Sequence, residues 1–173
     1  VNFWNFFGAG VFGFIINLPI ANYYEHGTYL TVNHGHAALM GVYGNLSIGA
    51  LLFCCRYLGK PEHWNEKLVK NAFWSINVGL LLMVIMDLFP AGLHQLFAAM
   101  DKGLWFARSQ AFIQSPAFQT MTWLRIVGGT LFTIGGVFPL TWFILKQTAY
   151  LKPSVLPLTP VAQKPVEEEV SVP

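Results

Sequence analysis

The sequence predicts an all-α fold, a polytopic bundle of membrane helices. Of the 173 residues, 54% are hydrophobic and 10% are charged, whereas a soluble domain carries charge on roughly a quarter of its residues. Several apolar runs are also long enough to cross a bilayer, which takes about 20 helical residues. We therefore expect one transmembrane region over residues 1–149, with about four spans. They cover residues 3–24, 34–58, 71–99 and 119–145.

The first two spans have distinct chemical features. The first is rich in aromatic residues and in glycines, which permit close helix contact, and Pro19 should kink its far end. A polar segment at 25–33, without Lys or Arg, separates it from the second span. The second span ends at Arg56, a cation placed where the helix dipole favours one.

The distribution of charge predicts the orientation in the membrane. The loop between the second and third spans carries three lysines, whereas residues 100–118 carry Lys102 and Arg108. The positive-inside rule places that loop in the cytoplasm, so that 25–33 and 100–118 face outward and the C-terminus is cytoplasmic. Residues 150–173 contain several prolines and a run of three glutamates. Because such a composition cannot bury a core, we expect a disordered cytoplasmic tail there.

Other features bear on the class of protein. Val1 is followed by aromatic residues with no basic leader, which indicates neither a signal peptide nor a natural start. We expect a truncated chain whose function belongs to a larger parent. Cys54 and Cys55 are neighbours, a spacing that rarely allows a disulfide, so we expect them to fill space in a helix. A net charge of +2 argues against nucleic acid as a partner.

The segment with the most chemical information is Asn33-His34-Gly35-His36, at the start of the second span. Two imidazoles at the end of a membrane helix are expensive to bury without partners. Successive α-helical residues turn by about 100°, which puts the two histidines about 200° apart on opposite faces. One metal ion cannot easily take both, because ligands on one face need a spacing of three or four residues.

Two interpretations of this pair fit the sequence. In the first, each histidine ligates a separate haem, one on either flank of the helix, because small neighbours such as Ala37 and Ala38 leave room for a flat macrocycle. In the second, both side chains form hydrogen bonds in the interfacial zone of the membrane. Spacing alone does not separate the two interpretations.

The same region resembles the large subunit of bacterial nitric oxide reductases, members of the haem-copper oxidase superfamily. The similar stretch reads LPIANYYEHGTYLTVNHGHAALMGVYGNL, within a resemblance over residues 3–146. It implies a C-terminal fragment in which His34 is the axial ligand of the high-spin haem and His36 that of the low-spin haem, both b-type. The family's second metal is a non-haem iron, whose histidine and glutamate ligands are not found in this sequence. We therefore expect no catalytic residue here and no activity from the fragment alone.

The resemblance also implies a reaction and partners. The enzyme would act in denitrification and the respiratory chain of the bacterial inner (cytoplasmic) membrane, reducing two nitric oxide molecules to nitrous oxide and water. Electrons would pass from the His36 haem to the His34 haem and its non-haem iron. The donor is a membrane quinol or a cytochrome c. The segments NLPIANYYEHGTYL and FPAGLHQ resemble the quinol-dependent branch of the family more closely. The other partners would be the rest of the same subunit and membrane lipid.

Further polar residues carry alternative interpretations. His26 either contacts a haem propionate, as the resemblance allows, or is a solvated loop residue. Arg125 either contacts a haem propionate or extends its guanidinium to the interface. Asp87 has a structural role at the Pro90 break, or pairs with another charge or lines a proton path. Glu25 and its neighbouring tyrosines form either an interfacial aromatic belt or the propionate and calcium region of the family.

Three rival functions remain. An oxygen-reducing haem-copper oxidase also carries an H-x-H motif on this helix, although Gly35, Ala37 and Ala38 favour the nitric oxide branch. A non-catalytic membrane anchor that holds haem should have a natural N-terminus and paired histidines on two helices for each haem. A transporter or channel fragment would rest on hydrophobicity alone.

Overall fold

The computed structural model describes residues 1–149, and the part that it describes is an all-α bundle. The first helix consists of η1 (Trp4–Val11), a wider π-helical stretch, and α1 (Phe12–Asn17). The next helix, α2 (Pro19–Glu25), leaves α1 at an angle of 98°. Leu18 has extended backbone angles at this bend, because a residue before proline is disfavoured in the helical conformation. The kink expected at Pro19 is confirmed.

The second long helix carries both predicted haem ligands. It combines α3 (Tyr29–Gly35), η2 (His36–Gly44) and α4 (Asn45–Leu58) into 30 continuous residues. It begins before the expected span, at Tyr29, because the hydroxyl of Thr28 accepts a hydrogen bond from the N–H of Leu30 and caps the helix. Gly59 follows its last residue.

The third long helix follows a short turn, η3 (Pro61–His63). It runs for 37 residues through α5 (Glu66–Met83), η4 (Val84–Leu88) and α6 (Phe89–Lys102). Pro90 does not end it. A proline removes one backbone donor and crowds the preceding turn, and the wider turns of η4 come directly before it.

The last long helix also contains a π-helical stretch before a proline. After η5 (Phe106–Arg108) and α7 (Gln110–Ile113), it runs for 33 residues through α8 (Pro116–Trp123), α9 (Arg125–Thr130), η6 (Leu131–Val137) and α10 (Phe138–Thr148). Pro139 again follows a π-helical stretch. Within residues 1–149, three helices are thus long and apolar enough to cross a membrane, and the bent first pair makes a fourth when counted as one span.

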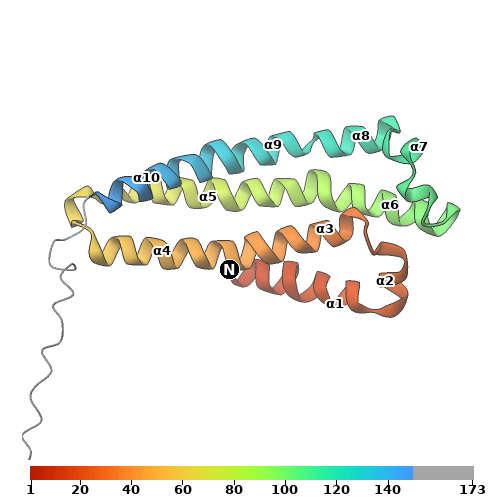
Figure 1. Ribbon diagram of the computed structural model, residues 1–173, viewed down its shortest axis with the longest axis horizontal. Helices are drawn as coiled ribbons and strands as arrows, with labels where there is room; N and C mark the ends of the chain where they lie inside the picture. Colours follow the sequence, from red (N-terminus) through yellow and green to blue (C-terminus); the bar gives the residue numbers. More distant parts are fainter. Residues whose placement is uncertain (150–173) are drawn as a thin grey trace, which may run out of the picture.

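The helices pack side by side in chain order (Figure 1). α8, α9 and α10 lie along α5 and α6, which lie along α3 and α4, with α1 outermost. Glycines let backbones approach closely: a β-carbon at Gly128 would lie 2.6 Å from the carbonyl oxygen of Gly79. Leu80 and Leu88 are fully buried at the centre of the main apolar core.

The outer surface of the described bundle is strongly apolar. Large side chains such as Phe14, Phe53 and Trp142 are more than half exposed. A surface of this kind is what lipid tails or further membrane helices cover. The disordered tail expected at 150–173 lies outside the described residues.

Candidate functional site

His34 lies against the first helix. Its Nδ1 is 2.8 Å from the backbone carbonyl oxygen of Gly8, which belongs to η1. The ring also passes close to Gly13 of α1, where an added β-carbon would come within 3.0 Å of Cε1. The imidazole is half-buried. Two glycines on the neighbouring helix therefore provide both the acceptor and the space that this side chain uses.

His36 occupies a different environment. Its side chain is exposed, and its Nδ1 is 3.0 Å from the carbonyl oxygen of Val32, one turn earlier on the same helix. The helix changes from α to π geometry between Gly35 and His36, and such changes are frequent at functional sites. The two rings thus use acceptors on different helices, and only one packs against α1.

The hydrogen bonds determine which ring nitrogen is available. A carbonyl oxygen can only accept, so Nδ1 must be the donor in both histidines. In a neutral imidazole the lone pair then lies on Nε2. Among residues 1–149, neither Nε2 has a hydrogen-bond partner. Metal-ligating histidines characteristically donate their second N–H to a carbonyl in this way, so the pattern suits each Nε2 to binding a metal ion.

Arg125 and Asp87 form an ion pair that joins α9 to η4. The Nε of Arg125 is 2.7 Å from Oδ2 of Asp87. The guanidinium also lies over the ring of Tyr29, 5.5 Å from its centroid. Pairing with another charge was one of the alternatives that the sequence left open for Asp87, and Arg125 is the partner that the structure gives it.

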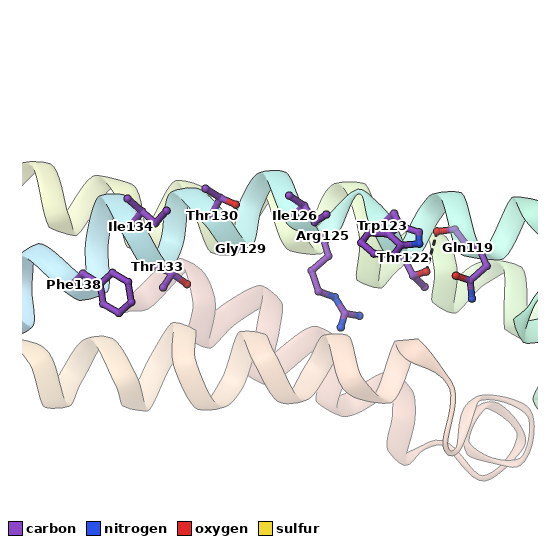
Figure 2. Close-up of a pocket in the computed structure, with 10 residues that line it drawn as sticks. All are labelled: Gln119, Thr122, Trp123, Arg125, Ile126, Gly129, Thr130, Thr133, Ile134 and Phe138. Atoms are coloured by element: carbon purple, nitrogen blue, oxygen red, sulfur yellow. Dashed lines mark hydrogen bonds between the residues drawn. The ribbon is translucent and has the colours of Figure 1, made fainter.

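The guanidinium borders a groove of about 650 Å³ on α8, α9 and η6. Figure 2 shows Arg125 reaching away from its own helix towards the pale orange helix that includes α3. The groove lining also includes Thr122, Gly129, Thr133 and Phe138. A mostly apolar wall with one cation and several hydroxyls suits an apolar ligand that carries an acidic group.

Several polar atoms are buried without partners on or beside the long helix 29–58, which we call the ligand helix after its two predicted haem ligands. Asn33, directly before His34, is fully buried, and neither its amide nitrogen nor its oxygen has a hydrogen bond within the described residues. The same holds for Oδ1 of Asp87 and Oε1 of Glu25. Buried polar atoms normally have partners. Ordered water or a neighbouring group would satisfy these atoms.

The remaining histidines lie apart from this pair. His26 is exposed at the end of α2, and its backbone carbonyl accepts a hydrogen bond from Arg108. His94 stacks on Phe112, with ring centroids 5.0 Å apart. Over the part of the chain that the structure describes, no three His, Cys, Asp or Glu side chains come together as a metal site.

Comparison with protein families gives a match over most of the chain. The family described as cytochrome c and quinol oxidase polypeptide I matches residues 1–131. The chain is 30% identical over 141 residues to a nitric oxide reductase subunit of Stutzerimonas stutzeri, a match that covers 75% of this chain and 28% of that protein.

Two similar proteins are cytochrome c oxidase subunits. The bacteroid cytochrome c oxidase subunit 1 homologue of Bradyrhizobium diazoefficiens is 28% identical over 139 residues, which covers 76% of this chain and 24% of that protein. Cytochrome c oxidase subunit 1 of Rhodobacter capsulatus is 27% identical over 141 residues, covering 76% and 25% respectively. The chain spans about a quarter of the length of these relatives.

Proposed function

The chain belongs to the cytochrome c and quinol oxidase polypeptide I family, the subunit I family of haem-copper oxidases, and on that premise we propose that it is part of a respiratory nitric oxide reductase. Membership makes it a portion of a membrane oxidoreductase. The proposed reaction is the reduction of two nitric oxide molecules to nitrous oxide and water. The sequence HGHAA, which begins at His34, and the similarity to a nitric oxide reductase subunit support this choice.

The proposal assigns His34 to the high-spin haem and His36 to the low-spin haem. The observation that carries it is the shared hydrogen-bond pattern, in which Nδ1 donates to a backbone carbonyl and Nε2 is left without a partner. When bound, the haems supply electron transfer and a binding position for nitric oxide. The chain holds each imidazole in one tautomer and orientation.

Other residues are proposed as contacts to the propionate groups at the edges of the two haems. Asp87 engages Nε of Arg125, and the terminal nitrogens have no carboxylate partner among the described residues, so they can serve a haem propionate. His26 remains a proposed propionate contact, supported by its place at the outer end of α2, just before the ligand helix. Calcium beside the propionates is a further proposal, supported by the buried carboxylate of Glu25.

The rest of the enzyme must come from outside this chain. The non-haem iron would be held by the preceding part of the same subunit, and we propose a quinol, rather than a cytochrome c, as electron donor. We place the protein in the bacterial inner membrane, with the loop around Lys60 and the C-terminus in the cytoplasm. The lysines of that loop support this orientation.

The second candidate is an oxygen-reducing haem-copper oxidase. The observation in its favour is that two of the similar proteins are cytochrome c oxidase subunits, at only slightly lower identity. The same two histidines would then ligate haems, so the ligand assignment is common to both candidates. Measurement of nitric oxide and oxygen consumption by the parent enzyme distinguishes them.

The haem assignment is tested by His34→Ala and His36→Ala, made separately in the full-length parent. We expect His34→Ala to remove the high-spin optical and electron paramagnetic resonance signals, His36→Ala to remove the low-spin signals, and both to abolish turnover. His63→Ala, in the exposed turn η3, is the control and should leave the spectra unchanged. Unaltered spectra in the His34 and His36 variants would show that neither ligates haem.

A further inference from the structure

The start of the ligand helix is tied to α6 by one buried side chain. Tyr29 is the first residue of α3, so its N–H has no acceptor within its own helix. Oε1 of Gln95 accepts this hydrogen bond at 2.9 Å. Nε2 of the same side chain donates to the carbonyl oxygen of Ala107 at 3.2 Å. Gln95 is only 4% exposed, so it connects the ligand helix to residues 103–108, which we call the strap.

The strap makes a second contact just before the helix. Arg108 donates from Nη2 to the carbonyl oxygen of His26. The adjacent Gly27 has a φ of +72°, and a β-carbon there would lie 3.2 Å from Nη2 of Arg108. A side chain at Gly27 would be strained and would crowd the guanidinium. The turn between α2 and α3 is therefore shaped to receive Arg108.

Apart from the interaction of the Tyr29 side chain with Arg125 of α9, the other hydrogen bonds at this end are local. The Thr28 hydroxyl donates to the carbonyl of Glu25 at 2.6 Å and accepts from the N–H of Leu30, and the Thr31 hydroxyl also donates to Glu25. These bonds close the turn but do not fix the helix relative to its neighbours. By contrast, the hydrogen bonds from Gln95 and Arg108 reach from this end to another long helix and to the strap.

We propose that Gln95 and Arg108 are positioning residues for His34 and His36. The inference rests on the proposed function, in which both histidines ligate haem iron. His34 lies roughly 7.5 Å along the helix from Tyr29, at about 1.5 Å of rise per residue. A movement of the first turn of an α-helix is passed along its axis to the following turns. Gln95 and Arg108 therefore set the height and rotation of both imidazoles. Contacts outside the ligand shell orient a metal's histidine ligands and tune the metal, and hydrogen bonding around the ligands is one of the means by which a protein adjusts a haem's potential.

Two further contacts hold this part of the helix, one on each flank. Gly92 of α6 packs against Leu30 so closely that a β-carbon on Gly92 would lie 2.6 Å from the backbone nitrogen of Leu30. On the other flank, Nδ1 of His34 must remain 2.8 Å from the carbonyl of Gly8. Loss of Gln95 would leave the N–H of Tyr29 without its acceptor, and the helix end would move to find another.

The test uses Gln95→Leu in the full-length enzyme, a substitution of similar volume that removes both hydrogen bonds. We expect retained haem, a shifted midpoint potential and altered resonance g-values of the low-spin haem, and slower turnover with an unchanged KM for nitric oxide. Gln114→Leu, at an exposed position beyond α7, is the matched control and should leave all five quantities unchanged. Gln95→Glu keeps the acceptor for Tyr29 and should restore part of the wild-type potential.

A purely structural role would give a different result. In that case Gln95→Leu would lower the yield of enzyme, but the assembled fraction would have wild-type potential and g-values, and positioning would be wrong. If Gln95→Leu does not assemble, Arg108→Ala and Arg108→Lys decide, because the first should shift the potential and the second should restore it. If His36→Ala loses the low-spin signals as expected but the Gln95 and Arg108 variants keep the wild-type potential, the positioning role is wrong and the haem assignment stands.

Discussion

At the scale of single residues, the Asp87–Arg125 ion pair is unequally exposed. The Asp87 side chain is completely buried, whereas 46% of the Arg125 side chain is accessible. A buried charge that loses its partner is strongly destabilising, by about 3–5 kcal/mol, but an accessible charge can move towards water or lipid headgroups and loses far less. The two members of the pair should therefore differ in what their removal does.

This inequality predicts the order of two substitutions. Arg125→Leu leaves a buried carboxylate alone and should destabilise the protein by up to about 3–5 kcal/mol, whereas Asp87→Leu should destabilise it less. The double variant should be more stable than Arg125→Leu, since it leaves no unpaired charge. Thermal unfolding of the solubilised parent enzyme measures the cycle. Equal effects of the two single substitutions would contradict the assigned burial of Asp87.

The sequence could predict the two histidines but not their acceptors. The H-x-H spacing on an apolar helix indicates separate environments for His34 and His36, because that follows from helical geometry. The partner of His34 is the backbone carbonyl of Gly8. Every residue type has such a carbonyl, so no residue pattern marks it. The role of Gln95 was equally hidden, since its two partners are backbone atoms.

At the scale of helices, close packing depends on glycines at matching heights. Gly79 of α5 and Gly128 of α9 face each other, and Gly136 packs against Ile76. In a bilayer the association of helices relies on such close contact, because lipid tails remove the hydrophobic driving force. A single methyl group at one of these positions should therefore separate two helices.

Gly128→Ala tests this packing directly. The new β-carbon would lie 2.6 Å from the carbonyl oxygen of Gly79 and 2.7 Å from the nitrogen of Met83, both backbone atoms that cannot turn aside. We expect a loss of about 1–3 kcal/mol of stability from overpacking. Gly49→Ala is the matched control, because nothing lies within 4 Å of its added carbon, and it should be neutral or stabilising by up to about 1 kcal/mol. Similar unfolding temperatures for the two variants would contradict the packing.

The sequence predicted the apolar helices better than their ends. Each of the four expected apolar runs falls on a long helix or on the bent first pair, and Pro19 correctly indicated the bend after α1. The start of the ligand helix at Tyr29 was missed, because residues 29–33 are partly polar and hydropathy alone does not count them. Thr28 was the available signal, as a capping residue before the helix. The π-helical stretches before Pro90 and Pro139 had no predictive signal apart from the prolines themselves.

At the scale of the whole molecule, the described bundle has two chemically different ends. The turn η3 and the end of α10 lie at one end, joined by a hydrogen bond from Gln147 to the carbonyl of His63, and α7 lies at the other (Figure 1). The first end carries Arg56, which lies over Trp64 at 5.0 Å, and the loop lysines. The proposed haem ligands are nearer the α7 end, since His34 and His36 follow the first turn of α3.

This polarity predicts the orientation of the protein in the membrane. Lysines near the η3 end should retain it in the cytoplasm, because basic loops are translocated poorly. In a parent background with Cys54 and Cys55 replaced by alanine, Gln114→Cys should react with a membrane-impermeant maleimide in intact spheroplasts. Glu62→Cys, also at an exposed position, should react only after permeabilisation. The reverse pattern would place the haem ligands near the cytoplasmic face, and the orientation proposed for the enzyme would be wrong.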